Sequence, residues 1–290
     1  MPQTLEALSR HNATLKSIRG IVHTMKTLSA INARPYEQVV RAIEAYHATV
    51  LRSLAAFSHS TARMSERPQH VGERWLVVFG SDHGLCGSYN EIVAQLVKEY
   101  CESLPHVEKR LLVIGQKMND ALLDHGLRGE GVLLPPASVD GIGRMAGEIV
   151  TRLDLVTRRR PLSRVAVTLA FTQRGEHGLR EPVTRRLLPL EEKLLRPTTR
   201  WQSRTLPDYS MAPDALFASL IRSHIYASVF RASAEAMATE NAARLALMQQ
   251  AEQSVDDRLE QVKAELSSGR QTEITNELMD VIIGFEALKR

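Results

Sequence analysis

The residues with the clearest potential for chemistry lie in one short segment, Gly80–Asn90, which reads GSDHGLCGSYN. Cys86 could act as a nucleophile with His83 as its base beside Asp82, and the glycines could hold a phosphate at the start of a helix. Their spacing matches neither G-x-G-x-x-G nor G-x-x-x-x-G-K-[ST], and no further signature of covalent catalysis accompanies them. The segment therefore predicts a tight turn in preference to a nucleotide site or an active site.

The remaining residues supply neither a metal-ligand set nor a redox pair. The ten histidines are scattered, and the two cysteines, Cys86 and Cys101, do not form a C-x-x-C motif. We therefore predict no catalytic residue, no metal and no cofactor. Two cysteines also cannot make a disulfide framework, which fits a reducing compartment.

The glycine-rich segment follows the first of several strand-length apolar runs in the middle of the chain. The runs cover residues 75–79, 111–114, 132–134 and 165–171, with 183–190 as a candidate edge strand. Helical stretches lie between them at 89–103, 116–125 and 141–159. Strands that alternate with helices in this way predict a parallel sheet with helices on its faces, in an α/β domain.

Both ends of the chain have the pattern of long helices. Residues 214–290 contain no proline, and apolar residues recur there at spacings of three and four from 245 to 266, broken only by Glu252. Residues 15–57 keep the same rhythm, although Pro35 should kink or interrupt that helix because it removes a backbone donor. The N-terminal seam consists of Leu15, Ile18, Val22, Met25, Ser29, Asn32, Tyr36, Val39, Ile43, Tyr46, Val50, Ser53 and Phe57.

The formal net charge of +4 is divided unevenly along the chain. Residues 1–74 carry ten Lys and Arg against five Asp and Glu, whereas residues 214–290 carry eight against twelve. Matching seams of opposite charge predict an intramolecular antiparallel coiled coil. A nucleic-acid binder would more often concentrate one sign of charge in one patch, but the net charge is too small to decide this question by itself. Our expectation is that nucleic acid is not a partner. We also expect a soluble protein without a signal peptide, because no apolar run approaches the roughly 18 residues of a membrane span.

A polar stretch, residues 270–277 (RQTEITNE), precedes a second apolar face in residues 278–285. It has two interpretations. It is either an exposed face of the coiled coil, or a contact surface on which Arg270 and Glu277 form charge-assisted hydrogen bonds with a partner.

Three segments together resemble the gamma subunit of F-type ATP synthases. Residues 75–90, WLVVFGSDHGLCGSYN, resemble that family's strand and its Ser-Asp-x-Gly-Leu-Cys-Gly-x-x-Asn turn. Residues 270–278 are similar to its C-terminal R-Q-x-x-I-T-x-E-L signature, and residues 18–26, IRGIVHTMK, to its early helix. The resemblance covers essentially the whole chain in order, and the turn and the C-terminal signature are its specific parts.

The resemblance implies a rotor shaft. Its fold would be α/β with a long antiparallel coiled coil and a Rossmann-like parallel-sheet domain inserted between the two helices. The domains would be 1–72, the N-terminal helix; 73–210, the Rossmann-like domain; and 211–290, the long C-terminal helix.

The same resemblance implies partners and a location. The partners would be the alpha, beta and epsilon subunits and the c-ring, at the cytoplasmic face of a bacterial inner membrane, with the chain as a peripheral protein. The subunit would couple rotation of the c-ring, driven by H+ or Na+ flow, to ATP synthesis or hydrolysis at the alpha/beta hexamer, without being catalytic itself.

The resemblance also assigns contact residues. The implied contacts with alpha and beta are Met25, Lys26, Arg270, Gln271, Thr275 and Glu277. The implied turn of the lower domain, on the side of epsilon and the c-ring, is Gly84, Leu85, Cys86 and Gly87. After the methionine the family has Val-Ala-Ala-Ser-Lys and a basic stretch, whereas this sequence has KTLSAINARP. That departure is similar to the alternate, N-type branch of these ATPases found in some bacteria.

Two other classes of protein fit parts of the pattern. The glycine turn would suit a small nucleotide-binding α/β enzyme with a coiled-coil dimerisation arm, and the long helices alone would suit a coiled-coil adaptor. Binding of ATP, NAD or a flavin to the isolated chain would favour the enzyme. Co-purification with alpha and beta subunits would favour the rotor over the adaptor.

Overall fold

The computed structural model describes residues 4–60, 73–104, 107–158, 165–175, 180–190, 205 and 208–288. The elements are α1 (Leu5–Ser60), β1 (Glu73–Phe79), α2 (Tyr89–Glu102), β2 (Glu108–Ile114), α3 (Gln116–Asp124), β3 (Gly131–Leu133), η1 (Val139–Gly141), α4 (Ile142–Arg158), β4 (Val165–Arg174), β5 (Arg180–Leu188) and α6 (Pro213–Leu288). They divide into two compact units: Met1–Ser29 with Arg244–Arg290, and Ala30–Ala243. The helices α1 and α6 contribute to both units. The predicted helix ends at Arg159 and Arg290, and the predicted domain boundary at residue 72, lie outside the described residues.

The second unit is built on a five-stranded sheet with the order β3-β2-β1-β4-β5. The pairs β1–β2, β1–β4 and β2–β3 are parallel, which confirms the predicted parallel strands. The edge strand β5 pairs antiparallel with β4, so the sheet is mixed where an all-parallel sheet was predicted. The reason lies in chain length: a parallel return needs a crossover of a dozen or more residues, and only the short segment between Arg174 and Arg180 joins β4 to β5.

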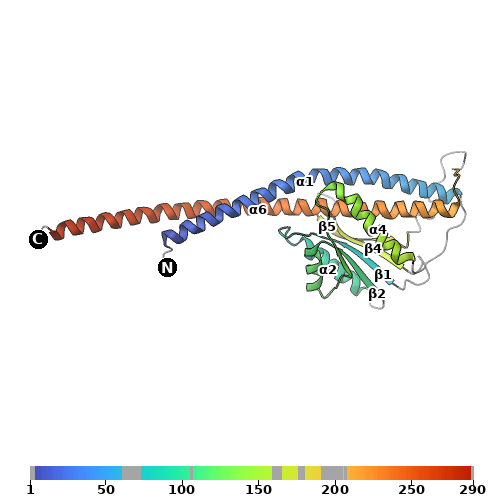
Figure 1. Ribbon diagram of the computed structural model, residues 1–290, viewed down its shortest axis with the longest axis horizontal. Coiled ribbons are helices and arrows are strands. Elements are labelled where there is room, and N and C mark those ends of the chain that lie inside the picture. Colours follow the sequence, from blue (N-terminus) through green and yellow to red (C-terminus); the bar gives the residue numbers. More distant parts are fainter. Residues whose placement is uncertain are drawn as a thin grey trace. The chain divides into compact units, whose positions relative to one another are not determined.

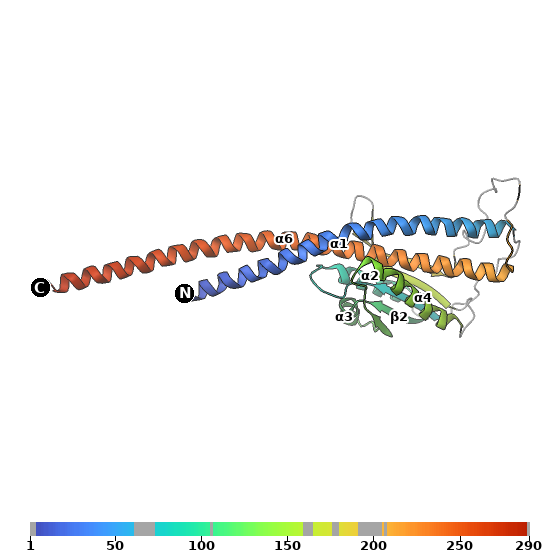
Figure 2. The same cartoon turned by 45° about the horizontal axis from the view of Figure 1, so that its top comes forward.

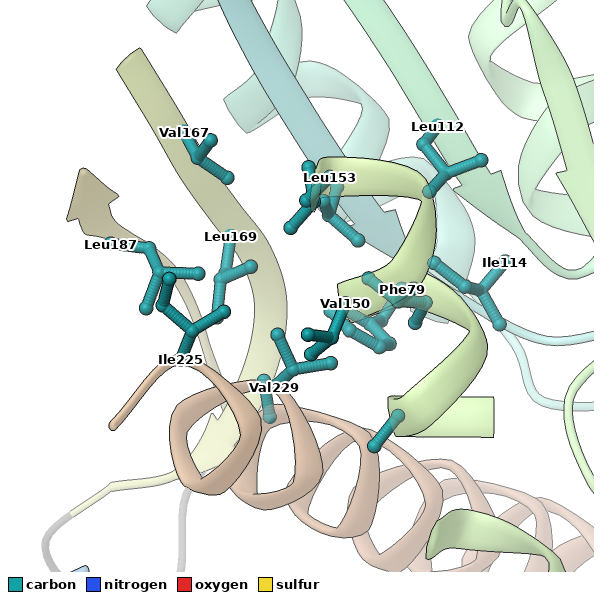
Figure 3. Packing of buried hydrophobic residues seen from close by; sticks show 14 of the residues in the cluster. Phe79, Leu112, Ile114, Val150, Leu153, Val167, Leu169, Leu187, Ile225 and Val229 are labelled. Atoms are coloured by element: carbon teal, nitrogen blue, oxygen red, sulfur yellow. The ribbon is translucent and has the colours of Figure 1, made fainter. Parts of the chain in front are cut away.

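The two faces of this sheet are covered by different helices (Figures 1 and 2). The helices α2 and α3 pack against one face, where Leu76, Val78 and Val113 are fully buried. Helix α4 and the early part of α6 pack against the other, where Phe79 and Val167 belong to the largest buried cluster, part of which Figure 3 shows. Adjacent strand residues thus alternate between two cores, which is why the strands are continuously apolar.

Small side chains let α6 lie close to its neighbours in this unit. Ala234 is fully buried and contacts Tyr36 of α1 and Ile142 of α4 in one cluster. Ala232 and Ala236 pack instead into the core above the sheet. In both views the α1 and α6 segments of this unit lie side by side (Figures 1 and 2). The alanine-rich stretch therefore serves the sheet core as well as the neighbouring helix.

The first unit pairs the start of α1 with the later part of α6. Leu8 and Leu15 pack with Leu259, Val262 and Leu266 in a buried cluster. Contacts run in opposite directions along the two helices, because Leu5 lies against Gly269 whereas Arg19 forms an ion pair with Asp256 at 2.6 Å. The apolar contacts between α1 and α6 in this unit are thus accompanied by an ion pair between exposed side chains.

Burial along α1 follows a period of seven residues. The deeply buried members of the predicted seam and its extension are Leu8, Leu15, Val22, Ser29, Tyr36, Ile43, Val50 and Phe57. The alternate members are less covered: Ile18 is 39% exposed and Tyr46 is 45% exposed. These two positions keep the spacing of the seam but are not covered within this chain.

Pro35 does not interrupt α1, which runs unbroken from Leu5 to Ser60. The prediction was a kink or an interruption, and the interruption is wrong for a local reason. Proline removes one backbone donor and leaves the carbonyl of Ile31 without its helical partner. Ile31 is 62% exposed, so that carbonyl lies on the solvent side of the helix, where water can satisfy it.

Among the helices that the structure describes, we find none with a stretch both long enough and apolar enough to span a bilayer.

Candidate contact surfaces

The glycine-rich turn after β1 is held together by its own side chains. The backbone N–H of Ser81 donates to Oδ1 of Asn90 at 2.9 Å, and Nδ2 of Asn90 donates to the Ser81 hydroxyl at 2.7 Å. The carboxylate of Asp82 accepts a hydrogen bond from the backbone N–H of Gln116 at the start of α3, at 3.2 Å. The polar residues of the motif therefore close the turn and tie it to the next helix.

The arrangement does not assemble a nucleophile with its base. The Cys86 thiol is buried and lies 3.4 Å from the Ser81 hydroxyl and 3.9 Å from the carbonyl oxygen of His83. The His83 side chain is 84% exposed, and its ring nitrogen lies 3.8 Å from Asp82. The thiol thus contacts the backbone of His83, while the imidazole of that residue points largely to solvent.

The residue that sequence reasoning missed in this segment is Tyr89. Its side chain is buried, and its hydroxyl donates to the carbonyl oxygen of Ala236 on α6 at 2.7 Å. It packs in a cluster with Cys86 and Ala243. Burial, followed by the charge of Glu240, raises the pKa of Tyr89, so the hydroxyl stays protonated as a donor. An aromatic residue with a polar tip beside a glycine turn was the signal for this attachment to the long helix.

The four residues of the implied lower-domain turn have different environments. Cys86 is buried, whereas Leu85 is 54% exposed and Gly87 lies on the surface. Gly84 is partly covered. Leu85 and Gly87 have φ angles of 62° and 65°, and the left-handed region favours glycine over any residue with a Cβ. The turn therefore presents a leucine to solvent, held in a conformation that costs energy.

The C-terminal part of α6 is a bare helix within the first unit. Every residue from Arg270 to Gly284 is exposed, beginning one residue after Gly269, which Leu5 covers at the start of α1. In Figure 1 this red end of α6 continues past the N-terminal end of α1. Six large apolar side chains are between 53% and 65% exposed there: Ile274, Leu278, Met279, Val281, Ile282 and Ile283. Six large apolar side chains exposed within ten residues of one helix make this segment a candidate interaction site.

Four of the predicted contact residues lie on this bare segment. Arg270, Gln271, Thr275 and Glu277 are all exposed. The Thr275 hydroxyl donates to the carbonyl oxygen of Gln271 at 2.8 Å, so it is engaged by its own helix. The side chain of Phe285, which belongs to the predicted apolar face, lies outside what the structure describes. The structure thus places the four polar groups among exposed apolar ones and leaves their partner open.

The other two predicted contact residues, Met25 and Lys26, lie further along α1. Lys26 forms an ion pair with Glu252 of α6, and Nδ1 of His23 lies 2.9 Å from the same carboxylate. Hydrogen bonds from Lys26 and then from His23 lower the pKa of Glu252. Glu252, the one acidic residue among the apolar positions of the C-terminal seam, is therefore paired with basic side chains of α1. Met25 is half-buried beside this pair.

Exposed apolar residues also surround Met25 on α1. Ile18, Ile21 and Leu28 are between 39% and 59% exposed. Within the described part of the chain, no group of three or more His, Cys, Asp or Glu side chains could hold a metal ion. The described surface thus offers apolar and charged contacts for a partner.

Comparison with known proteins bears on what covers these surfaces. A family model described as ATP synthase matches residues 4–288. The ATP synthase gamma chain of Burkholderia thailandensis is 30% identical over 267 residues, covering 88% of this chain and 86% of that one. The ATP synthase gamma chain of Dinoroseobacter shibae is 26% identical over 298 residues, covering 98% and 99%.

Solved structures give the same fold. One is a structure of Euglena gracilis mitochondrial ATP synthase, described as OSCP/F1/c-ring in rotational state 3. It contains a chain that matches this one with a TM-score of 0.66 and 14% identity, over 98% of this chain and 94% of that chain. A second structure from that organism, described as the rotor in rotational state 1, contains a chain with a TM-score of 0.62 and 14% identity, covering 93% and 98%. At this level of identity the likeness concerns the fold alone.

Proposed function

Because this chain belongs to the ATP synthase family as a gamma chain, we propose that its bare surfaces are those by which a central-stalk rotor works inside an F-type ATP synthase. A gamma chain is a structural subunit of the rotor and is not itself catalytic. Its partners are then the alpha, beta and epsilon subunits and the c-ring. Rotation of the ring, driven by flow of H+ or Na+, would be coupled through this chain to ATP synthesis or hydrolysis at the alpha/beta hexamer.

The observation that carries the proposal is the bare C-terminal segment of α6. From Arg270 to Gly284 every side chain is exposed, and six of them are large and apolar. Such a segment is costly in water, and an apolar sleeve formed by other subunits would cover it. A helix is also stiff along its axis, because each backbone N–H bonds within the helix. The segment is therefore suited to transmit torque inside a surrounding ring of subunits.

We further propose that α1 and α6 form an antiparallel coiled coil, with the sheet as a Rossmann-like domain inserted between them. The seven-residue burial period of α1 and the opposed contacts Leu5–Gly269 and Arg19–Asp256 support this. The domains would then be 1–72, 73–210 and 211–290. The complex would place the chain at the cytoplasmic face of a bacterial inner membrane, as a peripheral protein.

The proposed contacts with alpha and beta are Met25, Lys26, Arg270, Gln271, Thr275 and Glu277. The proposed contact turn on the side of epsilon and the c-ring is Gly84, Leu85, Cys86 and Gly87. Their exposure supports the assignment for the residues on α6 and for Leu85 and Gly87. Lys26 would reach beta only if it shared or released its bond to Glu252.

The experiment is reconstitution of this chain with alpha, beta and epsilon subunits and the membrane sector in vesicles. We expect ATP hydrolysis that drives ion uptake. Arg270→Ala and Glu277→Ala should each lower the number of ions moved per ATP, because a hydrogen bond to a charged group contributes about 1.5–3 kcal/mol. Lys263→Ala and Glu265→Ala, which change two other exposed charges on α6, serve as matched controls. Equal effects in both sets would show that Arg270 and Glu277 have no special role.

A further inference from the structure

Two histidines of the second unit lie against each other where α1 packs on α6. Nε2 of His47 on α1 lies 3.0 Å from Nδ1 of His224 on α6, and the two ring centroids are 5.0 Å apart. His224 is buried and His47 is half-buried. At this distance the two nitrogens share a hydrogen bond, so one imidazole donates its N–H and the other accepts with an unprotonated nitrogen. None of the surfaces proposed for the rotor includes this pair.

The pair belongs to a short polar layer between apolar contacts of the same two helices. On one side of the layer, Tyr36 of α1 packs with Ala234 of α6. On the other side, Phe57 of α1 stacks on Phe217 of α6, with ring centroids 5.7 Å apart. Figures 1 and 2 show these segments of α1 and α6 side by side. Because apolar contacts on both sides hold the helices together, the two imidazoles cannot move apart unless the helices separate locally.

The polar layer also contains an ion-pair network. Arg231 of α6 pairs with Glu44 of α1 at 2.9 Å and with Glu235 of α6 at 2.6 Å. Glu44 lies one helical turn before His47, so both contacts belong to the same side of α1. The negative charge of the two carboxylates is thus already paired with Arg231.

Charged groups from other elements also face the polar layer. Arg185 and Arg186 of β5 line, together with both histidines, a pocket of about 430 Å³. The strand β4 lines this pocket with apolar side chains. On the side of α4, Asp154 forms an ion pair at 2.6 Å with Arg222, two residues before the histidine of α6. The pocket gives water and protons a path to the imidazoles, and the charges that β5 adds there are positive.

These surroundings disfavour protonation of both imidazoles. Burial, followed by the charge of His47, lowers the pKa of His224 to about 4. Burial, followed by the charges of Arg231 and then Arg185, lowers the pKa of His47. Both imidazoles are therefore neutral at pH 7, which is the state in which one can donate to the other.

We propose that the His47–His224 pair is a pH-sensitive contact, which joins α1 to α6 while its imidazoles are neutral and opens when both take up a proton. With both protonated, each of the facing nitrogens carries a hydrogen and has no lone pair, so two donors and two positive charges would stand 3.0 Å apart. Like charges at this distance repel each other, and α1 would separate from α6 around His47. The proposal concerns the second unit alone and does not rest on the rotor function.

The direction of the pH effect follows from the two proton affinities of His224. In the opened contact water surrounds the imidazole, whose pKa is then near its ordinary value of 6.5, whereas in the closed contact the pKa is about 4. The opened contact therefore binds protons more tightly, so the closed one is fully stable above pH 6.5 and weakens as the pH falls towards 4. With these values, the equilibrium at pH 5 shifts about 30-fold towards the opened contact.

Hydrogen exchange of the full chain, followed by mass spectrometry, tests the proposal. The variant combines His47→Gln with His224→Asn, because these amides place uncharged donors and acceptors where Nε2 and Nδ1 lie. Wild type and variant are compared at the same pH, so the intrinsic exchange rate cancels. A helical segment that loses its packing partner exchanges its amides faster. We expect equal exchange in residues 43–54 at pH 7.5, and exchange about tenfold or more faster in the wild type at pH 5.

The matched control makes the same two changes at exposed imidazoles. It combines His11→Gln with His83→Asn, and should exchange like the wild type at both pH values. If the first variant disturbs the fold at pH 7.5, titration of the wild-type chain decides. In ¹H–¹³C NMR spectra, the imidazole signals of His47 and His224 should titrate at lower pH than those of His83.

Three results would each overturn the proposal. One is equal exchange at pH 5 in the wild type and in the variant with His47→Gln and His224→Asn. Another is titration of both paired imidazoles at the same pH as that of His83. The third is equally accelerated exchange in β1 and β4 at pH 5, which would show unfolding of the whole unit in place of a local opening of α1.

Discussion

Tyr89 should be the residue that fastens the glycine-rich turn to the long helix α6. Tyr89→Phe removes only the hydroxyl, which donates to the carbonyl oxygen of Ala236 at 2.7 Å. That carbonyl lies inside α6, where it accepts the backbone N–H of the residue four positions later, so the substitution leaves no buried acceptor without a partner. The cost should therefore be that of one ordinary hydrogen bond, about 1 kcal/mol. Tyr89→Ala would also empty the cluster with Cys86 and Ala243, at a cost of about 3–5 kcal/mol.

The assay is urea-induced unfolding followed by the fluorescence of Trp75, which lies on β1 within the second unit, in a Trp201→Phe background. In a thermal scan, about 1 kcal/mol corresponds to about 2–4 °C for a unit of this size. Tyr46→Phe makes the same chemical change on a side chain that is 45% exposed, and should alter the free energy of unfolding by less than about 0.5 kcal/mol. If Tyr89→Phe costs no more than Tyr46→Phe, the attachment through this hydroxyl is refuted.

Three further predictions concern other contacts of the same chain. Gly87→Ala should lower the free energy of unfolding in urea by about 1–2 kcal/mol, because Gly87 has a φ of 65°, which a residue with a Cβ adopts at a cost. The control is Gly84→Ala, which should be nearly neutral because Gly84 has open space around it and a φ outside the left-handed region. Glu252 has a pKa below its ordinary value of 4.5 because of its bond to Lys26, so its stabilising effect is present above that value and is lost as the pH falls through the lowered pKa. Glu252→Gln should thus lower the melting temperature at pH 7, and by progressively less as the pH falls through that lowered pKa; a loss that stays the same across this range would contradict the reasoning. Ala234→Leu should cost about 1–3 kcal/mol by overpacking, measured by urea unfolding, and an unchanged midpoint would show that the helices are not in close contact there.

Apolar patterning located the strands and helices of the sheet well, and the differences lie at their ends. The strand β2 begins at Glu108, three residues before the predicted Leu111. Its charged start pairs in register with the start of β1, and Arg110 forms an ion pair with Glu73 at 2.7 Å. A search for apolar runs misses charged residues that extend a strand, because backbone hydrogen bonds, and not burial, hold those residues in the sheet.

The seam of α1 was predicted in part. The positions seven residues apart are buried, whereas Ile18 and Tyr46 are exposed although they obey the same spacing. Periodicity shows which side of a helix is apolar, but the width of the strip that a neighbour covers depends on the neighbour. The proposed contact residues are a harder case. Arg270 and Glu277 are exposed in this chain, and the groups that would bind them belong to other subunits.

The most direct test of the central claim is single-molecule rotation. A complex of alpha and beta subunits would be assembled around this chain and fixed to a surface, with a bead attached through Lys117→Cys on the exposed side of α3. Lys117 is 52% exposed, whereas the native Cys86 and Cys101 are buried and should not react. The account predicts that ATP drives unidirectional rotation of the bead. A chain that does not assemble with alpha and beta, or a complex that hydrolyses ATP while the bead stays still, would contradict it.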